Sequence, residues 1–290
     1  MALLKIGEFS YNFFSNAGAR TGISCLTRPA YLLPSRLMCK IFAIARFTLL
    51  EAARSRLVWL VFGAVLVLCL ASFLVRELAI TESQRLQLAF LASMLRATNA
   101  LLIAAYIIST LHREFNDKVP ALILAMDVPR SHFVLGKSLG LGITAALIAL
   151  SCALPLALLA PVAAWWPWAV SLLLEAWIIA AVSLFCGFSL RSVAAGLLFT
   201  VGFYVLAKSM ATIQLISHSS LEIASAAHRY MTGLLDTLAL LLPRLDLFAQ
   251  TRWLVDGLDG VHLLGLAAQA LLFVALVSSA AMIDLYRKNL

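Results

Sequence analysis

The stretch Leu57–Val75, "LVWLVFGAVLVLCLASFLV", holds 19 consecutive residues without a charged side chain. A transmembrane helix needs about 20 mostly apolar residues, so this run predicts a membrane span. Five further segments have the same apolar character, although one is short and one carries Pro155. We therefore predict six transmembrane helices, over Leu57–Val75, Leu88–Thr110, Val134–Leu159, Trp168–Phe188, Ser192–Ala207 and His262–Ile283.

The composition of the whole chain agrees with this prediction. Of its 290 residues, 63% are hydrophobic and only 12% are charged, with a mean hydropathy of +0.98. A soluble domain carries about 25% charged residues, so the composition predicts an all-α polytopic membrane protein. The five cysteines form no Cys-x-x-Cys pair and have no histidine at ligand spacing, which argues against a disulfide framework or a metal site. Residues 37–290 have no internal repeat and are predicted to form one domain.

Positive charge is divided unequally between the two sides of the predicted spans. Of the 22 Lys and Arg residues, 15 lie on the side that holds both termini, 6 lie on the other side, and Arg96 lies within a span. Cytoplasmic segments of membrane proteins carry such an excess of Lys and Arg. We therefore predict that both termini are cytoplasmic and that the chain spans the inner membrane of the cell. The asymmetry accounts for the formal net charge of +8 without a nucleic-acid partner.

The sequence before the first span has two parts. Helical spacing from Met38 to Arg56 separates a side with Lys40, Thr48, Glu51, Arg54 and Ser55 from a side with Phe42, Ala45, Leu49 and Ala53. This pattern predicts an amphipathic helix at the membrane interface. Residues 1–36 form an N-terminal extension with three open interpretations: a disordered tail, a start placed upstream of a true start at Met38, or an organellar targeting peptide.

Two external connections follow from the span boundaries. Residues 208–261 are predicted to form the long external loop between the fifth and sixth spans. The link after the third span, "APVAAWWPW" from Ala160 to Trp168, is uncharged and rich in tryptophan. Because Trp favours the boundary between membrane and water, we predict a tight external turn with an aromatic anchor there.

The tripeptide Gly136-Lys137-Ser138 has the form in which a nucleotide-binding P-loop ends. A complete P-loop needs a glycine five residues before Gly136, where this chain has Ser131. An apolar span also follows, rather than the helix of a strand–loop–helix unit. We therefore interpret Lys137 as an anchor at the inner membrane interface. The glycines are interpreted as a flat face for a neighbouring helix, formed by Gly136, Gly140 and Gly142.

Two charged residues fall inside predicted spans, Arg96 in the second and Glu175 in the fourth. At a rise of about 1.5 Å per residue, both lie roughly 10–12 Å from the outer face. A charge at the bilayer centre costs at least about 2.5–3.5 kcal/mol unless it is paired or hydrated. We predict that these residues form an ion pair or share a hydrated cavity, with Asn99 on the same helical face as Arg96. A structural bridge and a substrate-pathway or proton-linked role both remain open.

Three stretches resemble type-2 permeases of ABC transporters. "HREFNDKVPALILAMDVPRSHFVLGKSLG" (His112–Gly140) resembles the region between their second and third spans. "LLPRLDLFAQTRWL" (Leu241–Leu254) resembles a stretch before the last span in the permeases associated with maturation of copper enzymes such as nitrous oxide reductase. "GFSLRSVAAGLLF" (Gly187–Phe199) is similar to their turn between spans four and five. With six spans and both ends inside, the resemblance covers residues 38–290.

The resemblance implies a membrane subunit with no catalytic residues and no ATPase site of its own. A separate ABC ATPase subunit would bind ATP and Mg, and this chain would bind no cofactor directly. A second copy would pair with the first as a homodimer in the lipid bilayer. Residues 113–130 would form a cytoplasmic coupling helix, bracketed by Glu114, Asp117 and Arg130, with an apolar face for the ATPase formed by Leu122, Leu124 and Met126.

Two other functions remain open from the sequence. An intramembrane enzyme or a proton-linked carrier would use Arg96 and Glu175, whereas a membrane scaffold would have no transport activity. No Ser/His/Asp arrangement or pair of carboxylates points to intramembrane catalysis, and the His and Met residues show no metal-ligand spacing. The substrate and the direction of transport are not indicated by any motif.

Overall fold

The computed structural model describes residues 33–78, 83–117, 130–190, 192–219, 243, 245–248 and 260–287. All regular secondary structure in these ranges is helical. The N-terminal extension, residues 1–36, lies outside the described part except for the first residues of a helix. The helices are α2 (Leu33–Arg54), α3 (Leu57–Leu78), α4 (Ser83–Asn116), α6 (Arg130–Leu159), α7 (Val162–Ser189), α8 (Val193–Ser219), α10 (Leu245–Phe248) and α12 (Gly260–Arg287).

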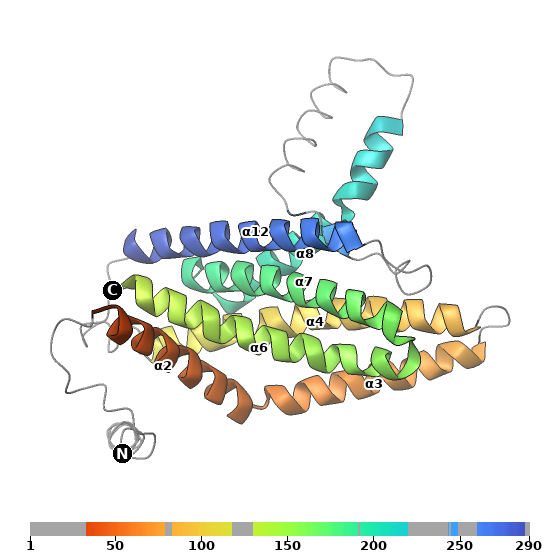
Figure 1. Cartoon of the computed structure of the whole chain (residues 1–290), viewed down its shortest axis with the longest axis horizontal. Coiled ribbons are helices and arrows are strands. Elements are labelled where there is room, and N and C mark those ends of the chain that lie inside the picture. Colours follow the sequence, from red (N-terminus) through yellow and green to blue (C-terminus); the bar gives the residue numbers. More distant parts are fainter. Residues whose placement is uncertain are drawn as a thin grey trace.

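Six of these helices are long and apolar enough to cross a membrane, namely α3, α4, α6, α7, α8 and α12. They pack into one bundle and alternate in direction along it (Figure 1). Each predicted span coincides with one of them, and only Ser192 falls outside its helix. Within the described residues, the prediction of an all-α polytopic fold with these six spans is therefore confirmed, and the chain is a multi-pass membrane protein.

One end of the bundle gathers the connections that the sequence assigns to the cytoplasm. Helix α4 ends there and α6 begins there, close to α2 and to the last turns of α12 (Figure 1). The side chains of Arg113, Lys137 and Arg287 belong to these helix ends. We refer to this end as the basic end. The side of the membrane on which it lies stays a prediction.

Helix α7 forms the centre of the bundle. In its most apolar stretch 72% of the residues are buried, against 11% in α3 and 17% in α12. It packs against α4, α6, α8 and α12, and its small residues Ala176 and Ala180 allow close approach. The outer helices instead expose large apolar side chains, such as Trp59 and Phe62 of α3. An apolar outer surface is what a bundle embedded in lipid requires.

Helix α2 packs closely along α6 over two glycines. A Cβ atom on Gly140 would lie 2.8 Å from the Thr48 Cβ and 3.0 Å from the Ala45 carbonyl oxygen. A Cβ atom on Gly136 would lie 2.9 Å from the Ile44 Cβ. These distances are shorter than ordinary carbon contacts, so only glycine allows this approach. The third predicted member of the flat face is wrong, because nothing lies within 4 Å of a Cβ on Gly142.

The predicted polar and apolar sides of the N-terminal amphipathic helix are wrong in part. Thr48, predicted on the polar side, is fully buried and faces α6 together with Ala45 of the predicted apolar side. The reason is that the surface of α6 over Gly136 and Gly140 accepts small side chains. The buried Thr48 hydroxyl keeps a hydrogen bond, because it donates to the Ile44 carbonyl at 3.0 Å. The location of α2 at the membrane interface stays a prediction.

Helix α2 does not continue directly into the first span. It ends at Arg54, and the Ser55 hydroxyl then accepts a hydrogen bond from the Leu57 N–H at 3.2 Å. Serine is a preferred residue for capping a helix N-terminus in this way. The break at Ser55 lets α2 lie against α6, while α3 turns away from the direction of α2 and packs mainly against α4 (Figure 1).

One predicted connection is wrong at its boundary, and the start of the other is helical. Helix α8 continues to Ser219, beyond the end of its apolar stretch at Met210, so the predicted external segment 208–261 begins as a continuation of α8; residues 208–219 contain no Gly or Pro that would end the helix. Helix α7 begins at Val162, directly after Pro161, so the tryptophans of the predicted turn belong to its first turns. Proline fits the start of a helix because no partner is needed there for its missing N–H. Most of the remaining loop lies outside the described residues.

Candidate functional site

Arg96 of α4 and Glu175 of α7 meet inside the bundle. The Arg96 Nη1 lies 2.5 Å from the Glu175 Oε2, and both side chains are 2% exposed. The structure thus brings together the two residues for which the sequence predicted an ion pair. Helices α4 and α7 both run toward the basic end (Figure 1). Because Arg96 and Glu175 are in contact, they lie at matching depth. Removing two charges from water costs several kcal/mol per ion, so such a pair needs further polar partners.

Two more residues of α7 contact the guanidinium of Arg96. Its Nη2 donates to the Ser171 Oγ at 3.0 Å, and its central carbon lies 5.1 Å from the centroid of the Trp168 ring. A desolvated cation–π contact of this kind contributes about 2 kcal/mol. Sequence reasoning placed Trp168 at the membrane boundary, but it is fully buried. Its spacing from Ser171 and Glu175, three and seven residues, places all three on one helical face and could have revealed the contact.

Several polar atoms beside the ion pair have no hydrogen-bond partner within the described part of the chain. They are the Asn99 Oδ1, the Trp168 Nε1 and the Glu175 Oε1. All three residues are almost completely buried. A buried polar atom without a partner costs about 1–3 kcal/mol, and native structures contain few of them. Three such atoms around one ion pair mark this position as a candidate binding site.

Helix α8 supplies two further polar residues, Tyr204 and Lys208. The Lys208 Nζ lies 3.4 Å from the Tyr204 hydroxyl and 5.5 Å from the centroid of its ring. Both residues interact electrostatically with Glu175 and Arg96. Tyr204 is buried and Lys208 is half-buried. Sequence reasoning missed Lys208 because it was assigned to the external loop, although its spacing of four residues from Tyr204 matches one helical face.

These residues form one site, which we call the intramembrane polar cluster. Three helices contribute to it, and its side chains offer charged, hydroxyl, amide and indole groups. It contains a single carboxylate, and no group of three or more His, Cys, Asp or Glu side chains gathers anywhere in the described ranges. The members are Arg96, Asn99, Trp168, Ser171, Glu175, Tyr204 and Lys208.

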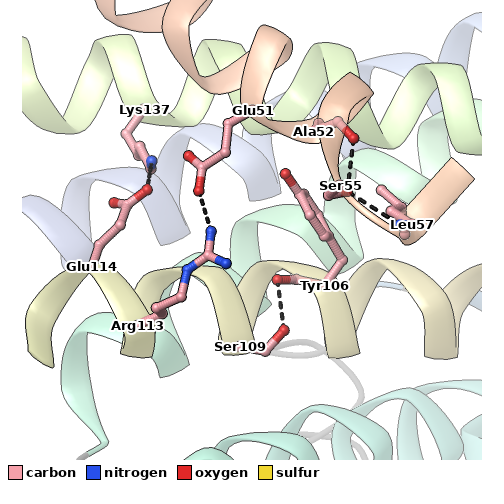
Figure 2. Close-up of polar contacts among 9 residues, drawn as sticks. All are labelled: Glu51, Ala52, Ser55, Leu57, Tyr106, Ser109, Arg113, Glu114 and Lys137. Atoms are coloured by element: carbon pink, nitrogen blue, oxygen red, sulfur yellow. Dashed lines mark hydrogen bonds and ion pairs between the residues drawn. The ribbon is translucent and has the colours of Figure 1, made fainter. Parts of the chain in front are cut away.

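A second set of ion pairs joins α2, α4 and α6 at the basic end (Figure 2). The Lys137 Nζ of α6 contacts the Glu114 Oε1 of α4. The Arg113 Nη2 of α4 lies 2.5 Å from the Glu51 Oε1 of α2. The Lys137 and Glu114 side chains are 4% and 10% exposed, whereas that of Arg113 is 64% exposed. We call these four residues the junction cluster, since adjacent residues of α4 hold two different helices.

The junction cluster changes two roles that the sequence suggested. The role of Lys137 as an interface anchor is wrong, because its ammonium group is buried and paired rather than directed to the membrane surface. Glu114 likewise points into the bundle, so its carboxylate does not border a surface that a partner protein could contact (Figure 2). The physical reason is the close packing of α4 and α6, which buries both side chains and makes each the partner that the other needs.

The remaining residues of the predicted coupling helix are only partly described. Asp117 follows the end of α4 and is exposed, and Arg130 is the first residue of α6. Residues 118–129, with Leu122, Leu124 and Met126, lie outside the described residues. The structure therefore places both ends of this segment at the basic end, beside the junction cluster.

A comparison with known protein families finds no family that matches this chain. A search of curated proteins finds no similar sequence. The resemblance to ABC permeases therefore depends on the three sequence stretches themselves, and the function that it implies is a proposal.

Proposed function

We propose that this chain is the permease subunit of an ATP-binding cassette transporter, in which a separate ATPase drives substrate movement across the membrane. The observation that supports the proposal is how the segment between α4 and α6 is held at its two ends. Its two ends emerge at the basic end of the bundle, and the junction cluster ties them to each other and to α2. A segment that transmits force needs such fixed ends.

The junction cluster offers a path for that force. Glu114 lies three residues before Asp117, and Lys137 lies seven residues after Arg130. Because this buried pair holds α4 to α6, displacement of the segment would move both helices together. Breaking a buried ion pair by removing one partner costs about 3–5 kcal/mol, which makes the connection stiff. Arg96 lies on the same helix as Glu114, so a movement of α4 at the basic end would also move this member of the intramembrane polar cluster.

The proposal assigns the remaining parts as follows. The apolar side chains of Leu122, Leu124 and Met126 contact the ATPase, with Asp117 and Arg130 at the edges of the contact. ATP and Mg are bound by that ATPase, so the basic end faces the cytoplasm and the membrane is the inner membrane. A second copy of the chain completes the transport pathway as a homodimer.

Co-purification of the full-length chain from its native membranes tests the proposal. We expect the tagged wild-type chain to carry a protein with a P-loop sequence, identified by mass spectrometry, and Mg-dependent ATP hydrolysis. Leu124→Glu places a charge in the proposed contact and is expected to reduce the bound ATPase about tenfold, as loss of a buried apolar contact does. Ala43→Glu is the matched control, because Ala43 is exposed on α2 and outside the contact.

Two outcomes contradict the permease proposal. In one, the wild-type chain carries no ATP hydrolase. In the other, Leu124→Glu retains as much of it as Ala43→Glu does. Thermal unfolding of each variant shows whether a loss of partner reflects a loss of fold.

A proton-linked carrier or intramembrane enzyme is the second candidate function. It is favoured by the unpartnered Oε1 of Glu175, which lies beside Arg96 within the membrane-spanning helices. A carrier of this kind would work without an ATPase. Liposomes that contain the purified chain alone should then show proton flux by a pH-sensitive dye, and Glu175→Gln should abolish it. Absence of flux from the wild-type chain would rule out the carrier.

A further inference from the structure

The intramembrane polar cluster is not balanced in charge. Arg96 and Lys208 each carry one positive charge, whereas Glu175 is the one carboxylate among its members. The cluster therefore has a formal net charge of +1 inside helices long and apolar enough to cross a membrane. The excess charge belongs to Lys208, whose ammonium group forms no ion pair with a carboxylate of the described residues. A negatively charged group would neutralise it.

The unpartnered atoms indicate further properties of that group. Among the residues that the structure describes, the Trp168 Nε1 is a hydrogen-bond donor without an acceptor, while the Asn99 Oδ1 and the Glu175 Oε1 are acceptors without a donor. A ligand that satisfies all three must accept hydrogen bonds and also donate them. A monovalent oxyanion with hydroxyl groups has both properties. A simple metal cation or an apolar molecule has neither.

We propose that the intramembrane polar cluster binds a monovalent oxyanion that carries hydroxyl groups. Dihydrogen phosphate has this chemistry, and so does the headgroup of phosphatidylglycerol. The oxyanion pairs with Lys208 and accepts a hydrogen bond from the Trp168 indole. Its hydroxyl groups donate to Asn99 and to the free oxygen of Glu175.

Lys208 is the member of the cluster through which the oxyanion reaches it. Its side chain is half-buried, while Arg96 and Glu175 are 2% exposed. It lies near the end of the apolar stretch of α8 that is farther from the basic end. The Tyr204 ring under its ammonium group fixes the direction of the side chain. Lys208 is therefore the most accessible charged residue of the cluster.

This inference does not depend on the proposed role as an ABC permease. Binding is measured on the purified full-length chain, without an ATPase, so either proposal can fail while the other stands. If both hold, the cluster identifies the class of substrate or lipid that the transporter handles.

Two binding measurements test the site and distinguish the sources of the oxyanion. Isothermal titration of the chain in a neutral detergent with inorganic phosphate, at constant ionic strength, reports a free oxyanion. Native mass spectrometry of the chain from nanodiscs of phosphatidylcholine mixed with phosphatidylglycerol reports a retained lipid. We expect binding in at least one measurement, and Lys208→Gln should weaken it about tenfold, the effect of losing one charge-assisted hydrogen bond.

Three variants make the test specific. Lys208→Arg keeps the charge and should retain binding. Trp168→Phe keeps an aromatic face under Arg96 but removes the indole N–H, and it should weaken binding several-fold. Arg76→Gln is the matched control, because it removes one positive charge from an exposed position at the last turn of α3 and should bind like the wild-type chain.

The inference would be overturned if the chain neither bound phosphate nor preferred phosphatidylglycerol over phosphatidylcholine. It would also be overturned if Lys208→Gln and the wild-type chain bound equally well. Equal weakening by Arg76→Gln and Lys208→Gln would also overturn it, because the effect would then follow total charge. A thermal unfolding curve for each variant shows whether it is folded. If Lys208→Gln does not fold, Trp168→Phe provides the test.

Discussion

The ion pair between Arg96 and Glu175 can be tested by a double-mutant cycle. Glu175→Leu would leave the Arg96 guanidinium buried, with only the Ser171 hydroxyl and the Trp168 ring as partners. Water cannot replace the lost carboxylate easily, because both side chains are 2% exposed. Removing one partner of a buried ion pair costs about 3–5 kcal/mol. We expect Glu175→Leu and Arg96→Met each to lower the free energy of unfolding by about this amount.

The double variant should be less harmful than either single change. Replacing a buried ion pair by apolar side chains of similar volume is often neutral or stabilising. We therefore expect the variant with both Arg96→Met and Glu175→Leu to unfold within about 1–2 kcal/mol of the wild-type chain. The coupling energy of the cycle would then be several kcal/mol. Exchange of the two charges, Arg96→Glu with Glu175→Arg, should recover part of the stability that either single reversal loses.

The measurement is equilibrium unfolding of the purified chain in mixed micelles, followed by the fluorescence of its six tryptophans. Arg76→Met serves as the control, because it removes an exposed arginine and should change the free energy of unfolding by no more than about 0.5 kcal/mol. Silent single variants would refute the reasoning. A double variant whose loss equals the sum of the single losses would refute it equally, since it would show that the two charges do not interact.

Two further predictions concern helix packing and the junction cluster. Gly140→Ala should lower the free energy of unfolding by about 1–3 kcal/mol, because the new Cβ would meet backbone atoms of α2, whereas Gly142→Ala in the same helix meets nothing within 4 Å and should cost nothing; equal melting temperatures of the two variants would contradict this. Glu114→Gln breaks a buried pair and should cost about 3–5 kcal/mol, whereas Arg113→Gln removes a side chain that is 64% exposed and should cost at most about 1 kcal/mol. Unfolding of both variants in urea or detergent measures the two losses of unfolding free energy. A larger loss for Arg113→Gln than for Glu114→Gln would contradict the prediction.

The spans could be predicted because hydropathy over about 20 residues is a local property of the chain. The matching depth of Arg96 and Glu175 could be predicted for a similar reason, since a helix rises by a fixed distance per residue. The end of α8 could not be placed, because the residues after Ala207 are moderately polar and still suit a helix. Faces were also misassigned: Thr48 looks polar, but its hydroxyl bonds to its own helix and allows burial against Gly140.

The partners of individual residues needed the tertiary structure. Lys137 stands near the start of a span, where lysine commonly reaches the membrane surface, yet packing of α4 on α6 places it against Glu114. Trp168 has the sequence context of an interface residue, yet it lies beneath Arg96. In both cases the deciding fact is which helix covers which face. Hydropathy summed along a span carries no information about that choice, because it does not record which face packs against which helix.

The sequence alone thus determined that this chain is a bundle of six membrane-spanning helices with a charged residue at equal depth in two of them. The tertiary structure decided that α7 lies at the centre, that α2 is held against α6 by glycine contacts, and that Lys208 of α8 joins Arg96 and Glu175 in one polar cluster. The physical reason for the division is range. The drive into the membrane is summed along each segment, whereas pairing of buried charges depends on contacts between helices far apart in the sequence.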